Sequence, residues 1–544
     1  MTLSAHVDSF ARDRLPPNEL MPDLVFDLPD LKYPERLNAA SELLGGAIAR
    51  GWGDRMAVLS PAGVRWTYRD LDAQANRIAN LLAGEMGVVP GNRVLLRGPN
   101  TPMMAACWFA VLKAGAIAVA TMPLLRAKEL TDIATKAEVS HALCDARLAD
   151  DLVAMRPQCP TLRRVAMFGT DTHESVERKS ASLPSTFDDV RTYAEDVALI
   201  SFTSGTTGRP KGTMHTHRDV IAASDCWPRH TLKASPDDVF TGSPPLAFTF
   251  GLGGLLVFPL RIGASTLLIE RPSPDALADA VEKLRPTVLV TAPTSYRAIA
   301  LASAGRDFSS LRKCVAAGEV LPASTRALWK ERTGIDIVDG IGSTEMFHIF
   351  ISHPDDDVRP GATGKAVPGY RACVIGDDGK PLPPGQVGKL AVKGPTGCKY
   401  LDDPRQANYV RDGWNLTGDA YLVDDDGWFV YQARTDDMIV SAGYNIAGPE
   451  VEEALMQHPA VADCAVVGAP DEARGTIVCA FVVLKEGHAD DAAMTAALQE
   501  HVKAAIAPYK YPRAVRYIEA LPRTETGKVQ RFKLRAMAQE GNPA

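Results

Sequence analysis

The chain has 544 residues, 46% of them hydrophobic, which is enough for roughly three or four core-sized units. Its net charge of −7 comes from 66 acidic and 59 basic residues, and the basic residues form no long run, so neither nucleic acid nor an anionic membrane is indicated as a partner. The nine cysteines are scattered, odd in number and without a Cys-x-x-Cys pair, which is typical of reduced thiols in a cytoplasmic protein.

The beginning of the chain gives no sign of export or membrane insertion. Residues 1–17 carry charges and no apolar h-region, so a secretory signal is not expected. The most apolar stretch, 104–125, has Lys113 in its middle, at a cost of about 3 kcal/mol on insertion scales, and Gly115 divides it. This pattern predicts a buried helix followed by a buried strand in a cytoplasmic protein.

Short apolar runs alternate with helical stretches through the first 430 residues. In the helical stretch 102–114 the proline suits the first turn, and Gly115 suits the position after the last. A second helical stretch covers 275–284. The alternation predicts parallel βαβ layers. The expected strands are 93–97, 116–120, 197–202, 265–269, 287–291 and 313–316.

The pattern changes after about Tyr431. Gly448-Pro449 opens an amphipathic helix with Val451, Ala454 and Leu455 on one face. Strands at 462–467 and 477–484 and a helix near 492–506 follow. These elements predict a separate small α+β unit.

Residues 203–212 read Thr-Ser-Gly-Thr-Thr-Gly-Arg-Pro-Lys-Gly, directly after an apolar strand. Glycines let backbone N–H groups turn toward anionic oxygens, while hydroxyls and a lysine add donors and charge. The segment is not a Walker A loop, because Pro210 precedes the lysine and Gly212 follows it. A generic flexible loop is the alternative, but three glycines, four hydroxyls and a lysine rarely coincide in a linker. We predict a triphosphate cradle made of Thr203, Ser204, Gly205, Thr206, Thr207 and Lys211.

Four further motifs follow in order: Gly342-Ser343-Thr344-Glu345, Leu416-Thr417-Gly418-Asp419, the segment 434–452, and Pro522-Arg523-Thr524-Glu525-Thr526-Gly527-Lys528. With the loop at 203–212 they resemble the adenylate-forming superfamily of acyl-CoA synthetases, peptide-synthetase adenylation domains and luciferases. The resemblance covers most of the chain. It implies an α/β fold with a large N-terminal ATP- and acyl-binding domain of βαβ layers, residues 1–433. A small C-terminal mobile α+β domain, residues 434–544, would carry the catalytic lysine and turn about a hinge at Asp436.

The resemblance also implies how charge is neutralised when ATP and a carboxylate meet. Glu345 would bind Mg²⁺, which favours one or two carboxylates completed by phosphate oxygens and water. Thr344 would hold the α-phosphate. Lys528 would contact both the substrate carboxylate and the α-phosphate during adenylation. An exposed lysine on a basic tail is the alternative for Lys528, since Lys510, Lys533 and Arg535 lie nearby in sequence.

The remaining nucleotide and CoA contacts are implied in the same way. Asp419 offers two acceptor oxygens to the ribose diol and Arg434 a bidentate fork to the same ribose. An adenine pocket would form where glycines let the base stack against backbone, although a turn without a ligand is the alternative for each of its segments. Its residues are Gly318, Glu319, Val320, Asp339, Gly340, Ile341 and Gly342. Tyr431 would be a further nucleotide contact, and the pantetheine of CoA would pass Ser441, Ala442 and Gly443.

His215 and His217 could form a metal pair. They follow the predicted phosphate loop directly, and no Cys, His or carboxylate cluster with ligand spacing supports them. A metal site there is therefore not favoured.

The segment 245–251 falls where the family places its acyl-pocket wall and aromatic gate. No aspartate is present there to meet an α-amino group, and no carrier segment is evident after Lys528, which argues against a peptide-synthetase domain. Residues 339–350 resemble the benzoate and 2-aminobenzoate branch of the CoA ligases. Phe248, Phe250 and Ile349 would form an apolar slot for one ring, with Thr249 and His348 able to read an ortho substituent. A packing histidine is the alternative for His348.

We therefore predict an aryl-CoA ligase. ATP and an aromatic acid, 2-aminobenzoate or benzoate, would give an acyl-adenylate and pyrophosphate, and CoA would then displace AMP. Thr249 and Phe250 replace the alanine and tyrosine that benzoate enzymes tend to show, which favours an ortho-substituted acid. The alternatives are an adenylating enzyme that loads a carrier protein and an inactive nucleotide and acyl sensor. ATP, Mg²⁺ and CoA are the expected cofactors, and the protein would be a monomer or homodimer.

Overall fold

The computed structural model describes residues 3–203, 210–441, 444–471, 475–506, 508–524 and 527–539. By internal packing the chain divides into two compact units. The first comprises residues 1–372 and 392–415, and the second residues 373–391 and 416–544. Both mix helices and strands, so the predicted α/β class with a large N-terminal and a small C-terminal part is confirmed. The predicted domain boundary between residues 433 and 434 says which part of the chain moves, and it stays a prediction.

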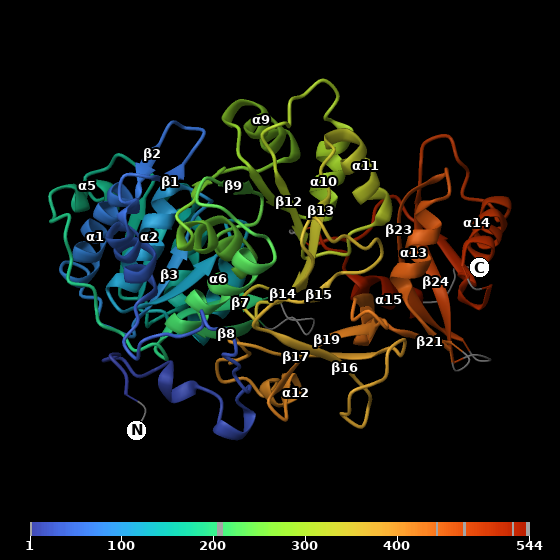
Figure 1. Ribbon diagram of the computed structural model, residues 1–544, viewed down its shortest axis with the longest axis horizontal. Helices are drawn as coiled ribbons and strands as arrows, with labels where there is room; N and C mark the ends of the chain where they lie inside the picture. The colour runs from blue at the N-terminus through green and yellow to red at the C-terminus, as the bar shows by residue number, and fades with distance from the viewer. Residues whose placement is uncertain are drawn as a thin grey trace. The chain divides into compact units, whose positions relative to one another are not determined.

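The first sheet of the first unit has six strands in the order β6-β5-β3-β4-β7-β8. Its strands pair in parallel except for β7 and β8, which are antiparallel. Helix α2 packs on β3 and β4, and α1 packs on α2 (Figure 1). The bounds are β3 (Arg93–Arg97), β4 (Ile117–Thr121), β5 (His141–Asp145), β6 (Arg164–Phe168), β7 (Val197–Thr203), β8 (Lys211–Thr216), α1 (Tyr68–Ala83), α2 (Pro102–Lys113), α3 (Ala127–Lys136), α4 (Ala149–Met155), α5 (Val176–Ala181) and α6 (His217–His230).

Lys113 shows why α2 is a buried helix of a globular core. Its side chain is 3% exposed, and its Nζ lies 2.9 Å from Asp72 and 3.0 Å from Asp189. The prediction of a buried helix followed by a buried strand is therefore confirmed. None of the helices in the described ranges combines the length and apolarity that a membrane crossing requires.

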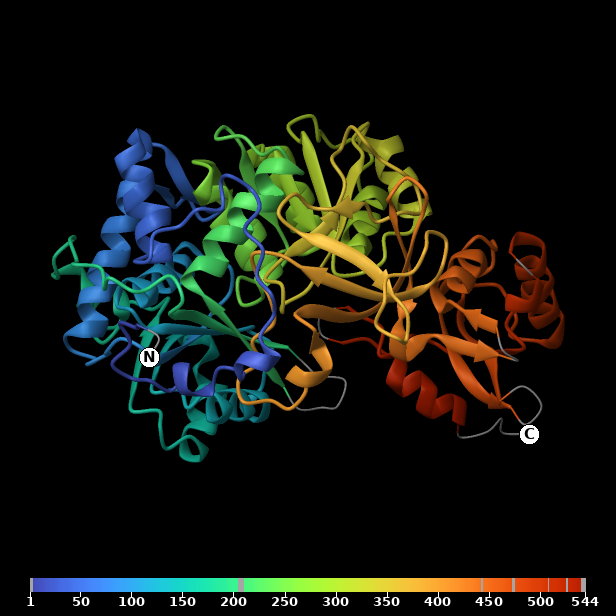
Figure 2. The ribbon, with the colours of Figure 1, turned by 60° about the horizontal axis from the view of Figure 1, so that its bottom comes forward.

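The second sheet of the first unit has nine strands in the order β15-β14-β13-β12-β11-β9-β10-β1-β2. The strands from β13 to β1 in this order pair in parallel. Helices α9, α10 and α11, yellow-green in Figure 2, pack beside one another next to this sheet. They contribute to an apolar core that includes Tyr296 and Trp329. The bounds are β1 (Met56–Leu59), β2 (Arg65–Thr67), β9 (Val239–Gly242), β10 (Ser265–Leu267), β11 (Val288–Thr291), β12 (Lys313–Ala317), β13 (Ile337–Gly342), β14 (Ile349–Ser352), β15 (Lys365–Ala366), α7 (Thr249–Leu252), α8 (Phe258–Arg261), α9 (Pro274–Leu284), α10 (Pro293–Leu301) and α11 (Ala323–Thr333).

A third sheet of five strands was not anticipated from the sequence. It has the order β16-β17-β19-β18, and β20 also pairs with β19. The pairings of β19 with β18 and with β20 are antiparallel, and turns with glycine at positive φ, such as Gly413 and Gly427, connect these strands. The bounds are β16 (Arg371–Ile375), β17 (Gly388–Lys393), α12 (Gln406–Tyr409), β18 (Val410–Arg411), β19 (Trp414–Val423) and β20 (Phe429–Arg434).

The C-terminal part of the second unit is the predicted small α+β fold. A three-stranded sheet of order β23-β24-β25 separates two apolar clusters. Alternate residues of β23 face opposite sides, so Val466 packs toward α13 and α14, and Val467 packs toward α15. The bounds are β21 (Ile439–Ser441), β22 (Tyr444–Ile446), α13 (Gly448–Met456), β23 (Val461–Asp471), β24 (Gly475–Leu484), α14 (Ala492–Ala505), β25 (Ala514–Tyr517) and α15 (Arg531–Gln539).

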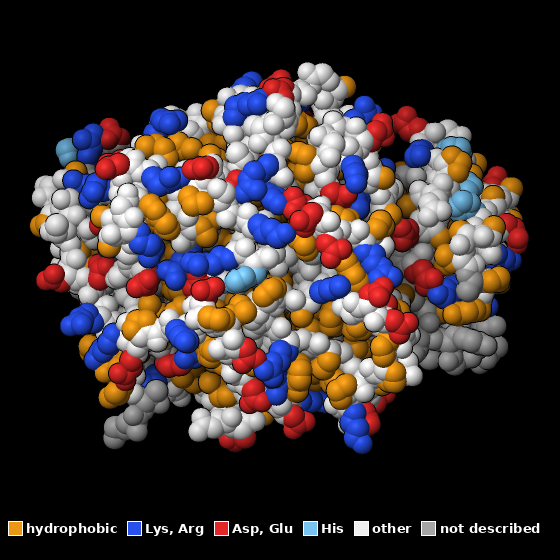
Figure 3. Space-filling model, in the orientation of Figure 1, with side chains coloured by type: hydrophobic (Ala, Val, Ile, Leu, Met, Phe, Trp, Pro, Cys, Tyr) orange, Lys and Arg blue, Asp and Glu red, His pale blue; other side chains and the backbone are white. Residues whose placement is uncertain are grey.

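The distribution of charges and the state of the cysteines both agree with the composition. On the face drawn in Figure 3, basic and acidic side chains are interspersed over the surface. The nine cysteines all lie in the described ranges, and each is a thiol; eight are buried, and Cys373 is half-buried.

Candidate active site

The two ends of the predicted phosphate loop are held together by strand pairing. Thr203, the last residue of β7, is the antiparallel partner of Lys211, the first residue of β8. The other predicted members of the cradle, from Ser204 to Thr207, lie outside the described residues. Lys211 Nζ donates a hydrogen bond of 3.0 Å to the Tyr400 hydroxyl and lies 3.7 Å from Glu345 Oε1.

Glu345, the predicted magnesium ligand, follows the end of β13 and is 7% exposed. The Tyr400 hydroxyl donates to its Oε1. Burial and the Glu345 carboxylate raise the pKa of Tyr400 far above its ordinary value, so the hydroxyl stays protonated. Tyr400 was not predicted, because nothing in the local spacing around it signals contact with residues 55 and 189 positions away.

The carboxylate of Glu345 suits a magnesium ion that has few protein ligands. Mg²⁺ keeps several waters and takes one or two carboxylates together with substrate phosphates. Within the described ranges, no group of three or more Cys, His, Asp or Glu side chains is placed to hold a metal by itself. The donor set therefore fits a magnesium that arrives with ATP.

The two histidines considered as a metal pair have other contacts. His215 Nε2 donates to the Thr344 backbone carbonyl at 2.7 Å, and His217 Nδ1 accepts the Ala39 N–H at 3.1 Å. Since a carbonyl can only accept, Nε2 of His215 carries the proton. His215 thus anchors the backbone beside Glu345.

A buried ion pair lies behind His215. Lys399 Nζ is 2.7 Å from Asp219 Oδ2, and His215 Nδ1 is 3.8 Å from the same oxygen. Burial opposes ionisation of Asp219, but Lys399 and His215 hold its pKa well below the ordinary range. The charged pair thus lies against His215 of β8, which in turn holds the Thr344 backbone.

The two predicted adenine segments lie side by side. The first, 318–320, follows β12, and the second, 339–342, forms the end of the parallel neighbour β13, where Gly340 pairs with Ala317. At Gly342 a Cβ would come within 2.6 Å of the His348 carbonyl oxygen, so the close approach of these backbones requires glycine. Burial raises the pKa of Asp339 to about 7, although Arg326 opposes the shift.

An aromatic cluster surrounds His348. Its ring lies 4.4 Å from Phe258 and 5.4 Å from both Trp227 and Phe250, between ring centroids. The ring Nε2 donates to the Phe250 carbonyl at 3.2 Å, while Nδ1 has no hydrogen-bond partner among the described residues. Burial lowers the pKa of His348 to about 3, so the ring is neutral. Thr249 and Ile349 are also buried, and Phe248 caps α7 and is half-buried.

The structure thus brings His348 and Phe250 together, and the acyl slot itself stays a prediction. Trp227 in α6 and Phe258 in α8 complete the cluster and were not predicted. The sequence carries little signal for these two residues, because an aromatic residue on an apolar helix gives the same sequence pattern whichever way its ring points.

In the second unit, Asp419 and Arg434 face each other on β19 and β20. Arg434 Nη1 donates to Asp419 Oδ1 at 2.8 Å and to the Thr417 carbonyl at 3.0 Å. Tyr431 stacks edge-on against Tyr421 on the same two strands, with ring centroids 5.4 Å apart. The predicted ribose ligands are therefore neighbours, already paired to each other.

The other predicted residues of the second unit lie in turns and edges. Lys528 is exposed, in a turn where its N–H donates to Thr524 Oγ1 at 3.1 Å. Asp436 lies in the 3-10 turn Thr435–Asp437. Ser441 ends β21 and is 2% exposed. Ala442 and Gly443 lie outside the described residues.

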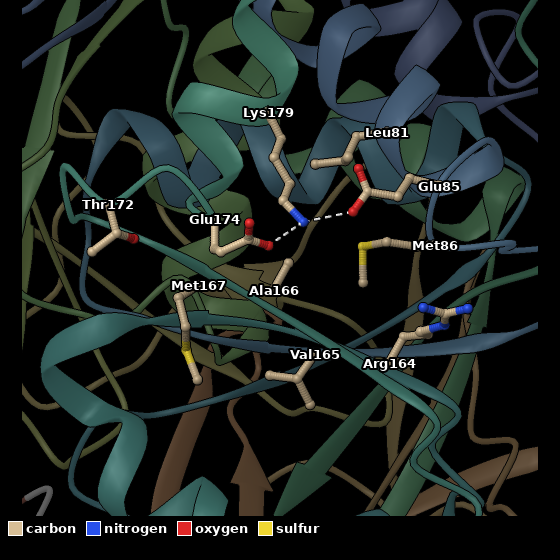
Figure 4. A pocket seen from close by; sticks show the side chains of 10 residues that line it. All are labelled: Leu81, Glu85, Met86, Arg164, Val165, Ala166, Met167, Thr172, Glu174 and Lys179. Carbon is tan, nitrogen blue, oxygen red and sulfur yellow. Dashed lines mark hydrogen bonds and ion pairs between the residues drawn. The ribbon is translucent and has the colours of Figure 1, made fainter.

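A hollow of about 320 Å³ lies elsewhere in the first unit, over β6 and beside α1 and α5 (Figure 4). Lys179 Nζ there contacts Glu85 and Glu174, each at 2.6 Å. None of the predicted site residues that are described lines this hollow, and its lysine is already compensated by two carboxylates. The chemistry therefore points to the region around Glu345 and His348.

Comparisons with known proteins bear on this region. The profile described as AMP-binding enzyme matches residues 47–399, and the profile described as AMP-binding enzyme C-terminal domain matches residues 450–528. The chain is 36% identical over 515 residues to benzoate–CoA ligase of Thauera aromatica, covering 93% of this chain and 97% of that protein. It is 33% identical over 516 residues to 4-hydroxybenzoate–CoA/benzoate–CoA ligase of Rhodopseudomonas palustris, covering 93% and 95%.

Solved structures agree with the sequence matches. The anthranilate CoA ligase AuaEII, in complex with anthranoyl-AMP, superposes with a TM-score of 0.88 at 34% identity, covering 93% of this chain and 98% of that one. A benzoate CoA ligase from Burkholderia xenovorans LB400 gives 0.82 at 31% identity, covering 92% and 99%.

Proposed function

Because this chain belongs to the AMP-binding enzyme family, we propose that it is an AMP-forming aryl-CoA ligase. The carboxylate oxygen of an aromatic acid attacks the α-phosphorus of ATP and releases pyrophosphate. The sulfur of CoA then attacks the acyl carbon, loses its proton and expels AMP, which leaves the thioester. Its use of ATP and CoA follows from this family.

The aromatic cluster around His348 is the observation that carries the aryl assignment. Trp227, Phe250 and Phe258 pack apolar rings around His348, and the one polar ring among them is neutral. An aromatic environment of this kind suits a planar ring better than a flexible polar substrate. The relatives named for benzoate and anthranilate support the same class of acid.

We propose 2-aminobenzoate as the preferred acid. Nε2 of His348 must be protonated to donate to the Phe250 carbonyl, so in the neutral ring Nδ1 is a bare acceptor. A buried acceptor without a partner costs about 1–3 kcal/mol. An ortho amino group supplies the missing donor, whereas benzoate does not. The alternative, in which His348 only packs, predicts no preference between the two acids.

The site residues of the first unit act on the triphosphate. Lys211 would neutralise phosphate charge, Thr344 would hold the α-phosphate, and Glu345 would hold a magnesium ion that supplies further charge neutralisation when bound. His215 keeps the Thr344 backbone in place through its 2.7 Å hydrogen bond. The residues of the cradle between 204 and 207, with Gly318 to Val320 and 339 to 342, complete the proposed ATP site.

The residues of the second unit act on the ribose, the transferred group and CoA. Asp419 and Arg434 would bind the ribose, Tyr431 would be a further contact to the nucleotide, and Lys528 would stabilise the charge that develops during adenylation. We further propose that Asp436 is the hinge and that residues 441–443 line the path of pantetheine. A cytoplasmic enzyme of aromatic degradation, monomeric or homodimeric, would have its nine thiols, ATP and CoA in a reducing compartment.

A panel of acids tests the proposal. We expect AMP release and a CoA thioester with 2-aminobenzoate and benzoate, little with bulky para-substituted acids, and scarcely any with acetate or long-chain fatty acids. AMP release without a thioester from free CoA would favour a carrier-protein loader. Absence of pyrophosphate release with every aromatic acid would favour the nucleotide and acyl sensor.

A further inference from the structure

The hydroxyl of Tyr400 lies between the two opposite charges of the proposed ATP site. Lys211 Nζ is 3.0 Å from this hydroxyl but 3.7 Å from the nearest oxygen of Glu345. An ammonium group has only donors and a carboxylate only acceptors, so the hydroxyl must accept from Lys211 and donate to Glu345. Lysine and glutamate therefore meet through the tyrosine and not in a direct hydrogen bond.

Tyr400 is held in this place from several sides. Its backbone N–H donates to Gln406 Oε1 at 2.9 Å. Its backbone also forms an antiparallel β-bridge with Thr213 of β8, the strand that begins with Lys211. Its ring packs edge-on against Tyr409, with centroids 5.7 Å apart, and its side chain is buried. The hydroxyl is therefore fixed relative to Lys211 by backbone contacts.

The arrangement matters because both charges have other partners in the reaction. A direct contact between ammonium and carboxylate at low solvent exposure would be strong, and it would occupy the lysine that phosphate needs and the carboxylate that magnesium needs. Resting on the proposed function, we propose that Tyr400 is a positioning residue that separates Lys211 from Glu345. The ammonium thereby remains available to the ATP phosphates and the carboxylate to Mg²⁺.

Tyr400→Phe removes the hydroxyl and keeps the ring. The lysine should then approach Glu345 directly and compete with both ligands. Calorimetric titration with ATP and Mg²⁺, without any acid so that no turnover occurs, should show affinity for Mg-ATP lowered about tenfold. The Mg²⁺ concentration for half-maximal pyrophosphate exchange with 2-aminobenzoate should rise by a similar factor.

Tyr296→Phe is the matched control. This tyrosine is also buried, and its hydroxyl donates to the Leu289 and Val315 carbonyls at 2.7 and 3.1 Å, without contact to Glu345. The Tyr296→Phe variant should lose about as much stability as Tyr400→Phe, but its Mg²⁺ requirement should not change. Thioester formation by Tyr400→Phe from supplied aryl-adenylate and CoA should stay near the wild-type rate, because that step involves no triphosphate.

A second background separates spacing from simple hydrogen bonding. With Lys211→Met there is no ammonium to approach Glu345, so adding Tyr400→Phe should leave the Mg²⁺ dependence of ATP binding unchanged or shift it to lower concentrations. If Tyr400→Phe raises the Mg²⁺ requirement in both backgrounds, or in neither, the spacing role is wrong. Failure of the wild-type protein to form an adenylate from any aromatic acid would instead overturn the proposed function, and the ATP titrations would still be informative.

Discussion

The two units hold their functional lysines in opposite ways. In the first unit Lys399 is 1% exposed and bound to Asp219, and Lys211 is half-buried beside Tyr400 and Glu345. In the second unit Lys528 is exposed in a turn whose hydrogen bonds join its backbone to Thr524. Charges that shape the site are fixed by burial, whereas the charge proposed to act on the transition state stands in solvent. The difference predicts that stability and catalysis can be impaired separately.

Lys399→Met should cause the largest loss. It leaves the Asp219 carboxylate buried without its partner, which typically costs about 3–5 kcal/mol of folding free energy. Urea denaturation monitored by tryptophan fluorescence would measure it. The matched change Lys283→Met removes an exposed partner of Asp279 and should leave the urea midpoint nearly unchanged. Equal losses would show that the buried pair does not brace the unit.

Lys528→Ala should impair chemistry and spare stability. Loss of a transition-state donor lowers the adenylation rate on the order of 10²- to 10³-fold. The urea midpoint should be unchanged, because the side chain is exposed. Pyrophosphate exchange would report adenylation, and thioester formation from supplied adenylate should be much less affected. Lys533→Ala, on the same basic tail, is the control; if it slows adenylation as much, the role belongs to net charge.

His348→Ala should sharpen the comparison inside the first unit. The variant loses the proposed acceptor for the ortho amino group, so kcat/KM should fall more for 2-aminobenzoate than for benzoate. The difference between the two losses should correspond to about 1–3 kcal/mol of transition-state stabilisation. Steady-state AMP release with both acids measures the difference. Equal losses would assign His348 to packing alone.

Asp339→Asn should change the pH dependence of stability. The native carboxyl has its pKa raised to about 7 from an ordinary value of 3.8, so between these pH values the native state holds a proton that the unfolded chain releases. This residue's contribution to stability therefore falls as pH rises from about 4 to 7. The urea midpoint of Asp339→Asn relative to wild type should increase over that range. A constant difference would mean that Asp339 ionises normally.

The sequence predicted the elements whose pattern is local. The strands expected at 93–97 and 313–316 form β3 and β12, and the helix after Gly448 forms α13, because apolar periodicity and end signals lie within each segment. The sheet of β16 to β20 was missed, since its strands are separated by turns and carry no long apolar run. Most site residues matched recognisable motifs. Tyr400, Asp219 and Trp227 instead act through contacts with residues 55 to 189 positions away, where spacing in the sequence carries no signal.

Because the thiols are buried, their reactivity reports when the surrounding structure opens. Burial raises the pKa of Cys107 and Cys226 well above its ordinary value, and it raises that of Cys479 to about 11. Alkylation requires the thiolate, so each of these cysteines reacts only after its surroundings open. Six buried cysteines belong to the first unit and two, Cys464 and Cys479, to the second. A pulse of alkylating reagent followed by peptide mass analysis would therefore time the opening of each unit separately, without any introduced label.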